Sequence, residues 1–181
     1  MTTATDGHLG FFRIPEGLGD NVVTNWTCFK KVQVHQSGIP CLSDIPVGST
    51  ISCLRCLMIA SKVLLFTGGD DNAIYITAVT FSPEISTQRI ASVPNAHAST
   101  ITGVLSLGDM HFLSCGIDQT IKFWRLDGDK LLWLYDCHTC VPDAGGILEI
   151  GAETAKRRFV VFGTGMEMIT WNLVLENGVL G

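Results

Sequence analysis

Short runs of alternating apolar and polar residues recur along the chain, and they predict β-strands rather than helices. In the clearest run, Ile121 and Phe123 alternate with Lys122 and Trp124, as expected for a strand with a buried face. The turn before this run carries Asp118, whose carboxylate can accept hydrogen bonds from backbone N–H groups just downstream. Four such strands per repeating unit account for almost the whole chain, which indicates an all-β fold.

A unit of small residues, a turn and an alternating apolar tail occurs four times. Its turn positions are Asp6, Asp71, Asp118 and Gly165, at intervals of 65, 47 and 47 residues. The first interval is 18 residues longer than the others, as one loop insertion around residues 45–61 would produce. A period in the forties is typical of the blades of a β-propeller. We therefore expect a partial propeller over residues 1–181, with a blade remnant at 1–23 and blades at about 24–80, 81–127 and 128–181.

A histidine marks the same phase of three units, at His35, His97 and His138. Each follows a candidate outer strand, and these are Trp26–Val34, Gln88–Val93 and Leu131–Tyr135. Each precedes a candidate inner strand, and these are Ile39–Ile45, Ile101–Leu107 and Gly146–Ile150. Within the insertion, residues 52–60 fit a short helix and a second inner strand equally well.

These markers resemble those of the WD-repeat β-propellers, which are defined by a Gly-His-like pair followed by a Trp-Asp-like pair. In that family, a buried His, Ser or Thr, Asp and Trp commonly form one hydrogen-bonded chain, here called a tetrad. One set matches fully: His97, Ser114, Asp118 and Trp124. Two sets match in part: His35, Thr67 and Asp71, with Thr77 in place of Trp; and His138 and Trp171, with Val161 and Gly165 in place of the hydroxyl and the acid. Three blades and a remnant do not close a ring, so we expect the chain to be part of a larger protein.

Five short strings narrow the resemblance: Thr5–Leu9, Val34–Ile39, Thr67–Ala73, Gly116–Gln119 and Val161–Glu167. In this order they are similar to the C-terminal propeller of the large eukaryotic WD-repeat proteins that are partner subunits of a tRNA ribose 2′-O-methyltransferase. The resemblance implies a non-catalytic accessory role. The partner would methylate the wobble nucleotide of the anticodon loop with S-adenosylmethionine, and the propeller would help to position the tRNA.

The alternative is a generic interaction adaptor, such as a substrate receptor of a ubiquitin ligase or a trafficking scaffold. Receptors of that ligase class usually carry an Arg two residues after the Trp-Asp pair. The segments Trp124–Asp127 and Trp171–Val174 lack this Arg, which disfavours the ligase interpretation.

Composition restricts the kinds of partner that the chain can bind. The net charge is −5 and only 16% of the residues are charged, which argues against a stand-alone nucleic-acid binder held by phosphate neutralisation. The longest apolar stretch, Cys56–Phe66, is too short to cross a bilayer, and the first residues lack the pattern of a secretory signal. We therefore expect a cytoplasmic location, no membrane contact, no small-molecule substrate, a protein partner, and tRNA bound indirectly through the complex. The seven cysteines are then expected to be reduced thiols.

Four candidate chemistries each have a structural alternative. Two CxxC pairs, at Cys53–Cys56 and Cys137–Cys140, have ligand types suited to zinc, but the propeller model places them on opposite faces, so no metal is expected. The trio of Ser114, His97 and Asp118 has no nucleophile elbow, so no catalytic residue is expected. No phosphate-binding glycine motif precedes a helix, so no cofactor is expected. The basic run Lys156, Arg157 and Arg158 is either a solvated loop or a set of RNA phosphate contacts.

Overall fold

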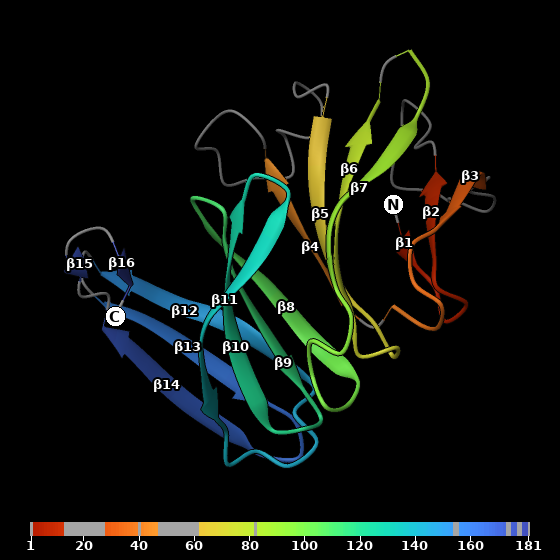
Figure 1. Ribbon diagram of the computed structural model, residues 1–181. Coiled ribbons are helices and arrows are strands. Elements are labelled where there is room, and N and C mark those ends of the chain that lie inside the picture. Colours follow the sequence, from red (N-terminus) through yellow and green to blue (C-terminus); the bar gives the residue numbers. More distant parts are fainter. Residues whose placement is uncertain are drawn as a thin grey trace, which may run out of the picture.

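The computed structural model describes residues 2–12, 28–39, 41–46, 62–81, 83–153, 156–172, 175–176 and 179–180, which form β-strands joined by turns (Figure 1). Within these ranges no helix is long and apolar enough to cross a membrane. Residues 47–61, which include Cys53 and Cys56, lie outside these ranges. The expectation of a helix or a strand at residues 52–60 therefore falls outside the described residues. Ile45 and Pro46, at the edge of the expected insertion, belong to a strand.

Most of the strands form four antiparallel sheets in which sequence neighbours pair. The first sheet holds β1 (Thr2–Thr3), β2 (His8–Phe12) and β3 (Cys28–Gln33). The second holds β4 (Cys41–Pro46), β5 (Lys62–Gly68), β6 (Ile74–Thr80) and β7 (Ser86–Val93). The third holds β8 (Ile101–Gly108), β9 (His111–Gly116), β10 (Thr120–Asp127) and β11 (Lys130–His138). The fourth holds β12 (Gly146–Glu153), β13 (Lys156–Phe162) and β14 (Met166–Asn172), and a separate pair is formed by β15 (Leu175–Glu176) and β16 (Val179–Leu180).

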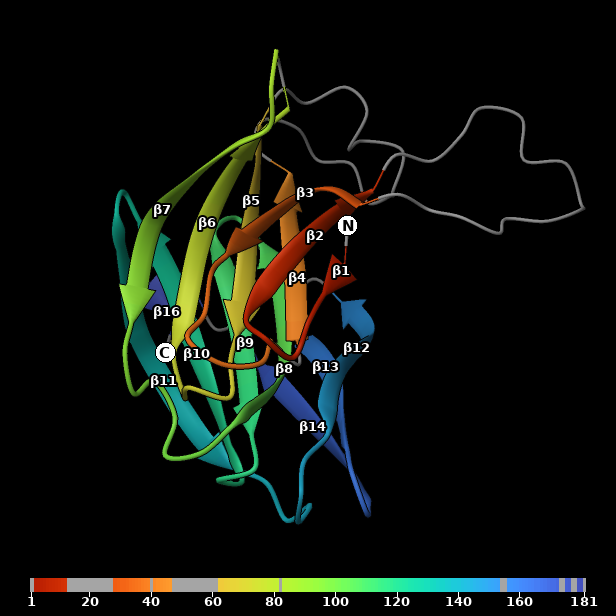
Figure 2. The same ribbon diagram turned by 90° about the vertical axis from the view of Figure 1, so that its right-hand side faces the viewer.

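The four sheets fan out face to face, with the first and the fourth at opposite ends of the fan (Figures 1 and 2). Strand β5 shows why they stack: Leu64 and Phe66 contribute to the core shared with the third sheet, whereas Val63 and Leu65 contribute to the core shared with the first. Side chains alternate along a strand, so a near-continuous apolar run is buried on both faces. The core is therefore divided into three layers, one between each pair of neighbouring sheets.

The all-β propeller architecture predicted from the sequence is confirmed. The expected repeats at 24–80, 81–127 and 128–181 are offset from the sheets by one strand. Strands β3, β7 and β11 each stand first in a sequence repeat but hydrogen-bond to the sheet before it. Each repeat therefore spans two sheets and links them covalently.

Candidate functional site

The third sheet carries a complete buried hydrogen-bonded chain at one end of its strands. Trp124 Nε1–H donates to Ser114 Oγ over 2.8 Å, and the Ser114 hydroxyl lies 2.7 Å from His97 Nε2. The other ring nitrogen of His97, Nδ1, donates to Asp118 Oδ1 over 3.0 Å. The side chains come from β9, β10, the β9–β10 turn and the loop between β7 and β8, so the structure brings together all four residues of the predicted tetrad.

Asp118 also anchors the backbone around this chain. Its carboxylate accepts the Thr120 N–H at 3.1 Å and the Thr120 hydroxyl at 2.8 Å within the turn. It accepts the Ala98 N–H at 2.8 Å from the loop that enters the sheet. Gln119 adopts a left-handed φ of 60°, an uncommon conformation for a residue other than glycine. The network therefore fixes a turn and a loop against each other.

The second sheet has a related network around His35. His35 Nδ1 donates to Asp71 Oδ1 over 2.8 Å, and Thr67 Oγ1 lies 2.9 Å from His35 Nε2. Buried Thr77 stands where the third sheet has Trp124, and none of the described tryptophans completes the chain. Instead, the ring of Tyr75 packs edge-on against His35 with centroids 4.4 Å apart. The predicted partial set is thus brought together, with Tyr75 as a neighbour that the sequence did not indicate.

Glycines explain how the histidines fit so closely to the turns. A Cβ on Gly69 would lie 2.2 Å from His35 Nδ1 and 2.3 Å from Asp71 Oδ1. A Cβ on Gly116 would lie 2.8 Å from Thr100 O and 3.1 Å from His97 Nδ1. Gly69 directly follows β5 and Gly116 is the last residue of β9, so the glycine before Asp71 and before Asp118 has a steric cause.

The fourth sheet corrects the third predicted set. His138 is the last residue of β11. Its side chain is exposed and does not bond to Glu167, the acid of this sheet. The next residue, Thr139, is buried, and its hydroxyl donates to Glu167 Oε2 over 2.6 Å. The Cys140 N–H donates to the same oxygen over 2.7 Å, as the Ala98 N–H does to Asp118. The structure thus replaces His138 by Thr139, and Glu167 supplies the acid that Gly165 was expected to lack.

Trp171 also has a different role from the predicted one. Trp124 lies six residues after its acid, whereas Trp171 lies four residues after Glu167. Its ring packs at 3.6 Å between centroids on Phe123, and edge-on at 5.1 Å against Tyr135. It therefore belongs to the core between the third and fourth sheets rather than to a tetrad.

The electrostatics of the networks fit a structural role. Burial lowers the pKa of His97 and of His35, and the nearby carboxylates offset this only in part. Burial alone would raise the pKa of Asp118, but hydrogen bonds from His97, Thr120 and Ala98 lower it. The histidines are therefore neutral and Asp118 is charged at neutral pH. Ser114 is fully buried, so its hydroxyl is not available to attack a substrate as a hydrolase nucleophile would.

The other candidate residues are dispersed. Cys137 is half-buried and Cys140 is exposed, and no group of three His, Cys, Asp or Glu side chains gathers as a metal site in the described part of the chain. Of the basic run that opens β13, Arg157 Nε lies 3.5 Å from Glu149 Oε1, whereas Lys156 and Arg158 are exposed.

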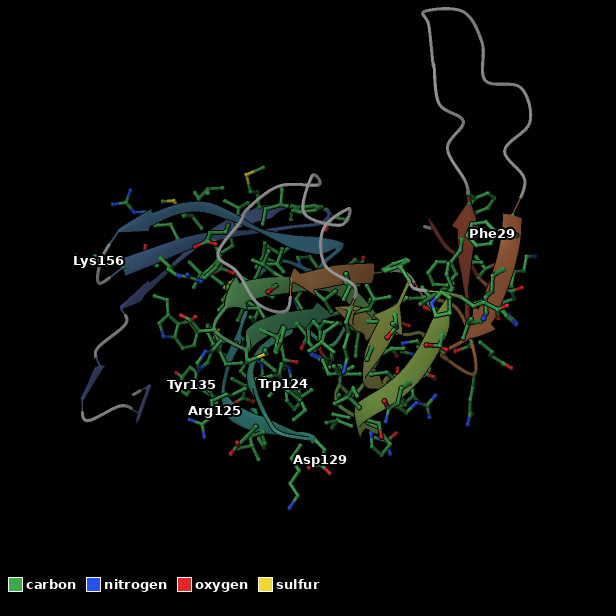
Figure 3. The ribbon with its side chains drawn as sticks, turned by 90° about the horizontal axis from the view of Figure 1, so that it is seen from above. Phe29, Trp124, Arg125, Asp129, Tyr135 and Lys156 are labelled. Atoms are coloured by element: carbon green, nitrogen blue, oxygen red, sulfur yellow. The ribbon has the colours of Figure 1, made fainter. Side chains whose placement is uncertain are left out.

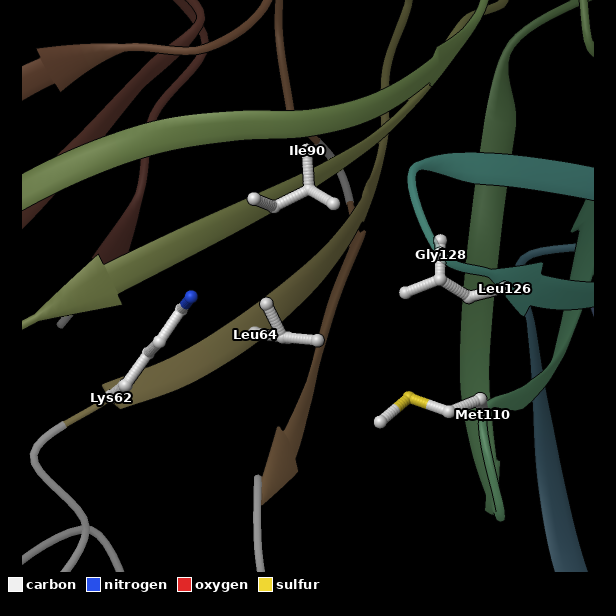
Figure 4. A pocket seen from close by; sticks show the side chains of 6 residues that line it. All are labelled: Lys62, Leu64, Ile90, Met110, Leu126 and Gly128. Atoms are coloured by element: carbon white, nitrogen blue, oxygen red, sulfur yellow. The ribbon is translucent and has the colours of Figure 1, made fainter.

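An open groove of about 360 Å³ lies between the second and third sheets, at the end of β5 away from the His35 network (Figure 4). Its lining is apolar apart from one lysine and consists of Lys62, Leu64, Ile90, Met110, Leu126 and Gly128. No residue of the predicted sites lines it.

Fanned antiparallel sheets give the described residues the architecture of part of a β-propeller, and the buried Trp124–Ser114–His97–Asp118 chain resembles the tetrad of WD-repeat proteins. No family model matches the chain. It is similar to proteins of rat, mouse and human that are each named tRNA (34-2'-O)-methyltransferase regulator WDR6, with 23%, 25% and 25% identity over 187, 193 and 193 residues. The alignments cover 94% of this chain but only 16–17% of those proteins, so the chain spans about a sixth of their length. The predicted resemblance to WD-repeat proteins, and among them to the partner subunits of a tRNA 2′-O-methyltransferase, is confirmed.

Proposed function

We propose that this chain is a non-catalytic accessory scaffold for a tRNA 2′-O-methyltransferase that modifies the wobble nucleotide, position 34. One observation carries the proposal: the similarity to proteins named as regulators of that reaction extends over 94% of the chain. The match extends over nearly the whole chain rather than over one blade.

The chemistry of the described residues agrees with a scaffold role. The pairs His35–Asp71, His97–Asp118 and Thr139–Glu167 belong to hydrogen-bonded networks that stabilise turns. In this proposal the methyltransferase supplies the catalytic groups and the S-adenosylmethionine site, and the complex acts in the cytoplasm.

Lys156 and Arg158 are the proposed contacts to tRNA phosphate. Both are exposed at the start of β13, and such contacts position an RNA without reading its sequence. Arg157 contributes less in this proposal because its side chain is only partly exposed.

Affinity purification of the tagged protein from its source cells tests the proposal. We expect a tRNA methyltransferase among the co-purifying proteins, and tRNA crosslinked to the complex. A Lys156→Ala, Arg158→Ala double variant should keep the methyltransferase and lose most of the tRNA crosslinks. Lys130→Ala, which removes an exposed lysine from the third sheet, is the matched control and should change neither. Recovery of ligase or vesicle-coat components without a methyltransferase would support the adaptor alternative and reject this proposal.

A further inference from the structure

The chain crosses from one sheet to the next just before each network histidine, and the backbone there is bonded to the sheet that it leaves. The His97 N–H donates over 3.3 Å to the carbonyl of Asn72, which follows Asp71 in the turn between β5 and β6. In the same way, the His35 N–H donates over 3.2 Å to the carbonyl of Gly7, in the turn between β1 and β2. The preceding sheet therefore holds the backbone of each histidine, whereas the following sheet holds its ring.

The carbonyl of the same peptide unit is bonded from the other side, by a cation of the following sheet. Lys122 Nζ, on β10 of the third sheet, donates over 2.7 Å to the carbonyl of Ala96, the residue before the histidine. Arg89 Nη2, on β7 of the second sheet, donates over 2.8 Å to the carbonyl of Val34, again the residue before the histidine. At both crossings one peptide unit thus lies between a turn of one sheet and a cation of the next.

Each cation also lies over an aromatic ring. Lys122 Nζ is 5.2 Å from the ring centroid of Trp133, and Arg89 Cζ is 4.2 Å from that of Tyr75. Both distances are within the roughly 6 Å over which a cation is attracted to the face of a ring. The two kinds of residue have exchanged strands, because β10 carries the cation of the third sheet and β6 carries the aromatic residue of the second.

Strand register shows that these positions correspond. Lys122 pairs with Ser114, and Tyr75 pairs with Thr67, so each stands opposite the hydroxyl residue of its network. The cation of one sheet and the aromatic residue of the other therefore occupy the same place relative to the histidine.

The outer-strand positions correspond as well. Trp133 pairs with Trp124, and Arg89 pairs with Thr77, and in each sheet a bulge adjoins this pair. Figure 3 shows Trp124 on the side of the third sheet that is toward the second, and Lys122 lies on the same face two residues earlier. The second and third sheets thus carry an aromatic residue and a cation at the same two places, in opposite order.

We propose that Lys122 and Arg89 are positioning residues of two equivalent clamps. Each clamp holds the peptide unit before a network histidine between two sheets, and the cation can stand at either of the two places provided that the aromatic residue takes the other. A charged donor makes the stronger kind of hydrogen bond, and a carbonyl polarised in this way makes its own N–H a better donor. The ring lies against the cation and restricts the long side chain that carries it.

The charge of each cation also reaches the histidine. Burial is the main cause of the low pKa of His97, and the positive charge of Lys122 lowers this pKa further. Arg89 acts on the pKa of His35 in the same direction, again after burial. The clamps therefore favour the neutral rings that the networks require.

Amide hydrogen exchange followed by NMR tests the clamp of the third sheet. Lys122→Met removes the ammonium and keeps an unbranched apolar side chain. We expect the His97 amide to exchange about tenfold faster or more, because its segment loses a hydrogen bond to a charged donor. The Leu113 amide, in the core of the same sheet, should change by less than about threefold, because the opening is local. Lys130→Met removes an exposed lysine from β11 and is the matched control, which should change neither.

A double substitution tests whether the two places are exchangeable. Lys122→Tyr alone should speed the exchange of the His97 amide as Lys122→Met does. Adding Trp133→Arg, which copies the arrangement of the second sheet, should return the rate to within about threefold of wild type. A double variant that exchanges as fast as Lys122→Tyr alone would overturn the proposal. So would a Lys122→Met variant in which the His97 and Leu113 amides change by the same factor.

The second sheet gives an independent test should a variant of the third sheet not fold, as its melting curve would show. Arg89→Met should speed the exchange of the His35 amide by about tenfold or more, whereas Arg89→Lys, which keeps a charged donor, should lose less than half of that factor. Equal rates for Arg89→Met and wild type would overturn the proposal. None of these measurements involves a methyltransferase or tRNA, so the clamps and the accessory role can fail separately.

Discussion

Replacing Asp118 by alanine removes the acceptor at the end of the tetrad. His97 Nδ1, in a fully buried ring, loses its carboxylate partner at 3.0 Å, and the turn loses the two hydrogen bonds from Thr120. The Ala98 N–H loses a 2.8 Å acceptor but lies in an exposed residue, so water can take its place. The main loss is therefore the charged acceptor of His97 Nδ1, which keeps only the Thr120 hydroxyl at 3.0 Å.

The expected cost follows from that count. A hydrogen bond from a buried donor to a charged acceptor is worth about 1.5–3 kcal/mol, and the exposed groups add little because they are resolvated. For a domain of this size each kcal/mol lowers the melting temperature by about 2–4 °C. A central cost of about 2 kcal/mol therefore predicts a fall of roughly 4–8 °C.

Urea unfolding followed by tryptophan fluorescence, at one fixed protein concentration, measures this cost. Asp118→Asn should lie between wild type and Asp118→Ala, because the amide oxygen still accepts. Asp127→Ala is the control: its carboxylate is exposed and lies 4.0 Å from Arg125, so the change should stay within about 0.5 kcal/mol. Equal denaturation midpoints for Asp118→Ala and Asp127→Ala would refute the reasoning that the tetrad stabilises the fold.

Three further predictions follow from the same contacts. The pKa of His35 and of His97 is lower in the folded protein than the value of about 6.5 in the unfolded chain. Their contribution to the unfolding free energy is therefore fully present above about pH 6.5 and is lost as the pH falls below it. Unfolding free energy should fall between pH 7 and pH 5 by up to about 1.4 kcal/mol per pH unit for each histidine, and a flat profile would contradict this. Glu167→Ala should destabilise by about 1–2 kcal/mol and His138→Ala by less than about 0.5, as denaturation midpoints can show. Burial raises the pKa of the Cys115 thiol to about 12, so iodoacetamide at pH 8 should label Cys140 in the folded protein and leave Cys115 unmodified until denaturant is added, as peptide mass spectrometry would detect.

The sequence predicted the fold well because the signals of a blade are local. Alternation placed the strands, and the regular interval located the turns at Asp71 and Asp118 with their histidines. Glycine before each acid was part of the motif, and the close approach of His35 to Gly69 gives its physical reason.

The fourth sheet departed from the prediction because a fixed interval tolerates no change in turn length. Its acid stands at residue 167, two positions beyond the expected turn position, and lies at the start of β14. His138 ends the outer strand β11 and Thr139 directly follows it, and histidine was the better chemical match to the motif. A shift of one residue reverses the direction of a strand side chain, and the structure points His138 to solvent and buries Thr139.

Surface exposure was the other feature that the sequence could not supply. The apolar residues of β14 read like those of any internal strand, and only the arrangement of the sheets leaves Met166 and Met168 uncovered. Likewise, the ion pair that engages Arg157 depends on the pairing of β12 with β13, across a bulge that no local pattern marks.

Ribose methylation at tRNA position 34 tests the central functional claim most directly. It would be quantified by nucleoside mass spectrometry in source cells that lack this protein and in the same cells with the protein restored. The account predicts that 2′-O-methylation at this position is lost without the protein and returns with it, while methylation elsewhere in the same tRNAs is unchanged. Methylation at position 34 that persists at its normal level without the protein would contradict the account.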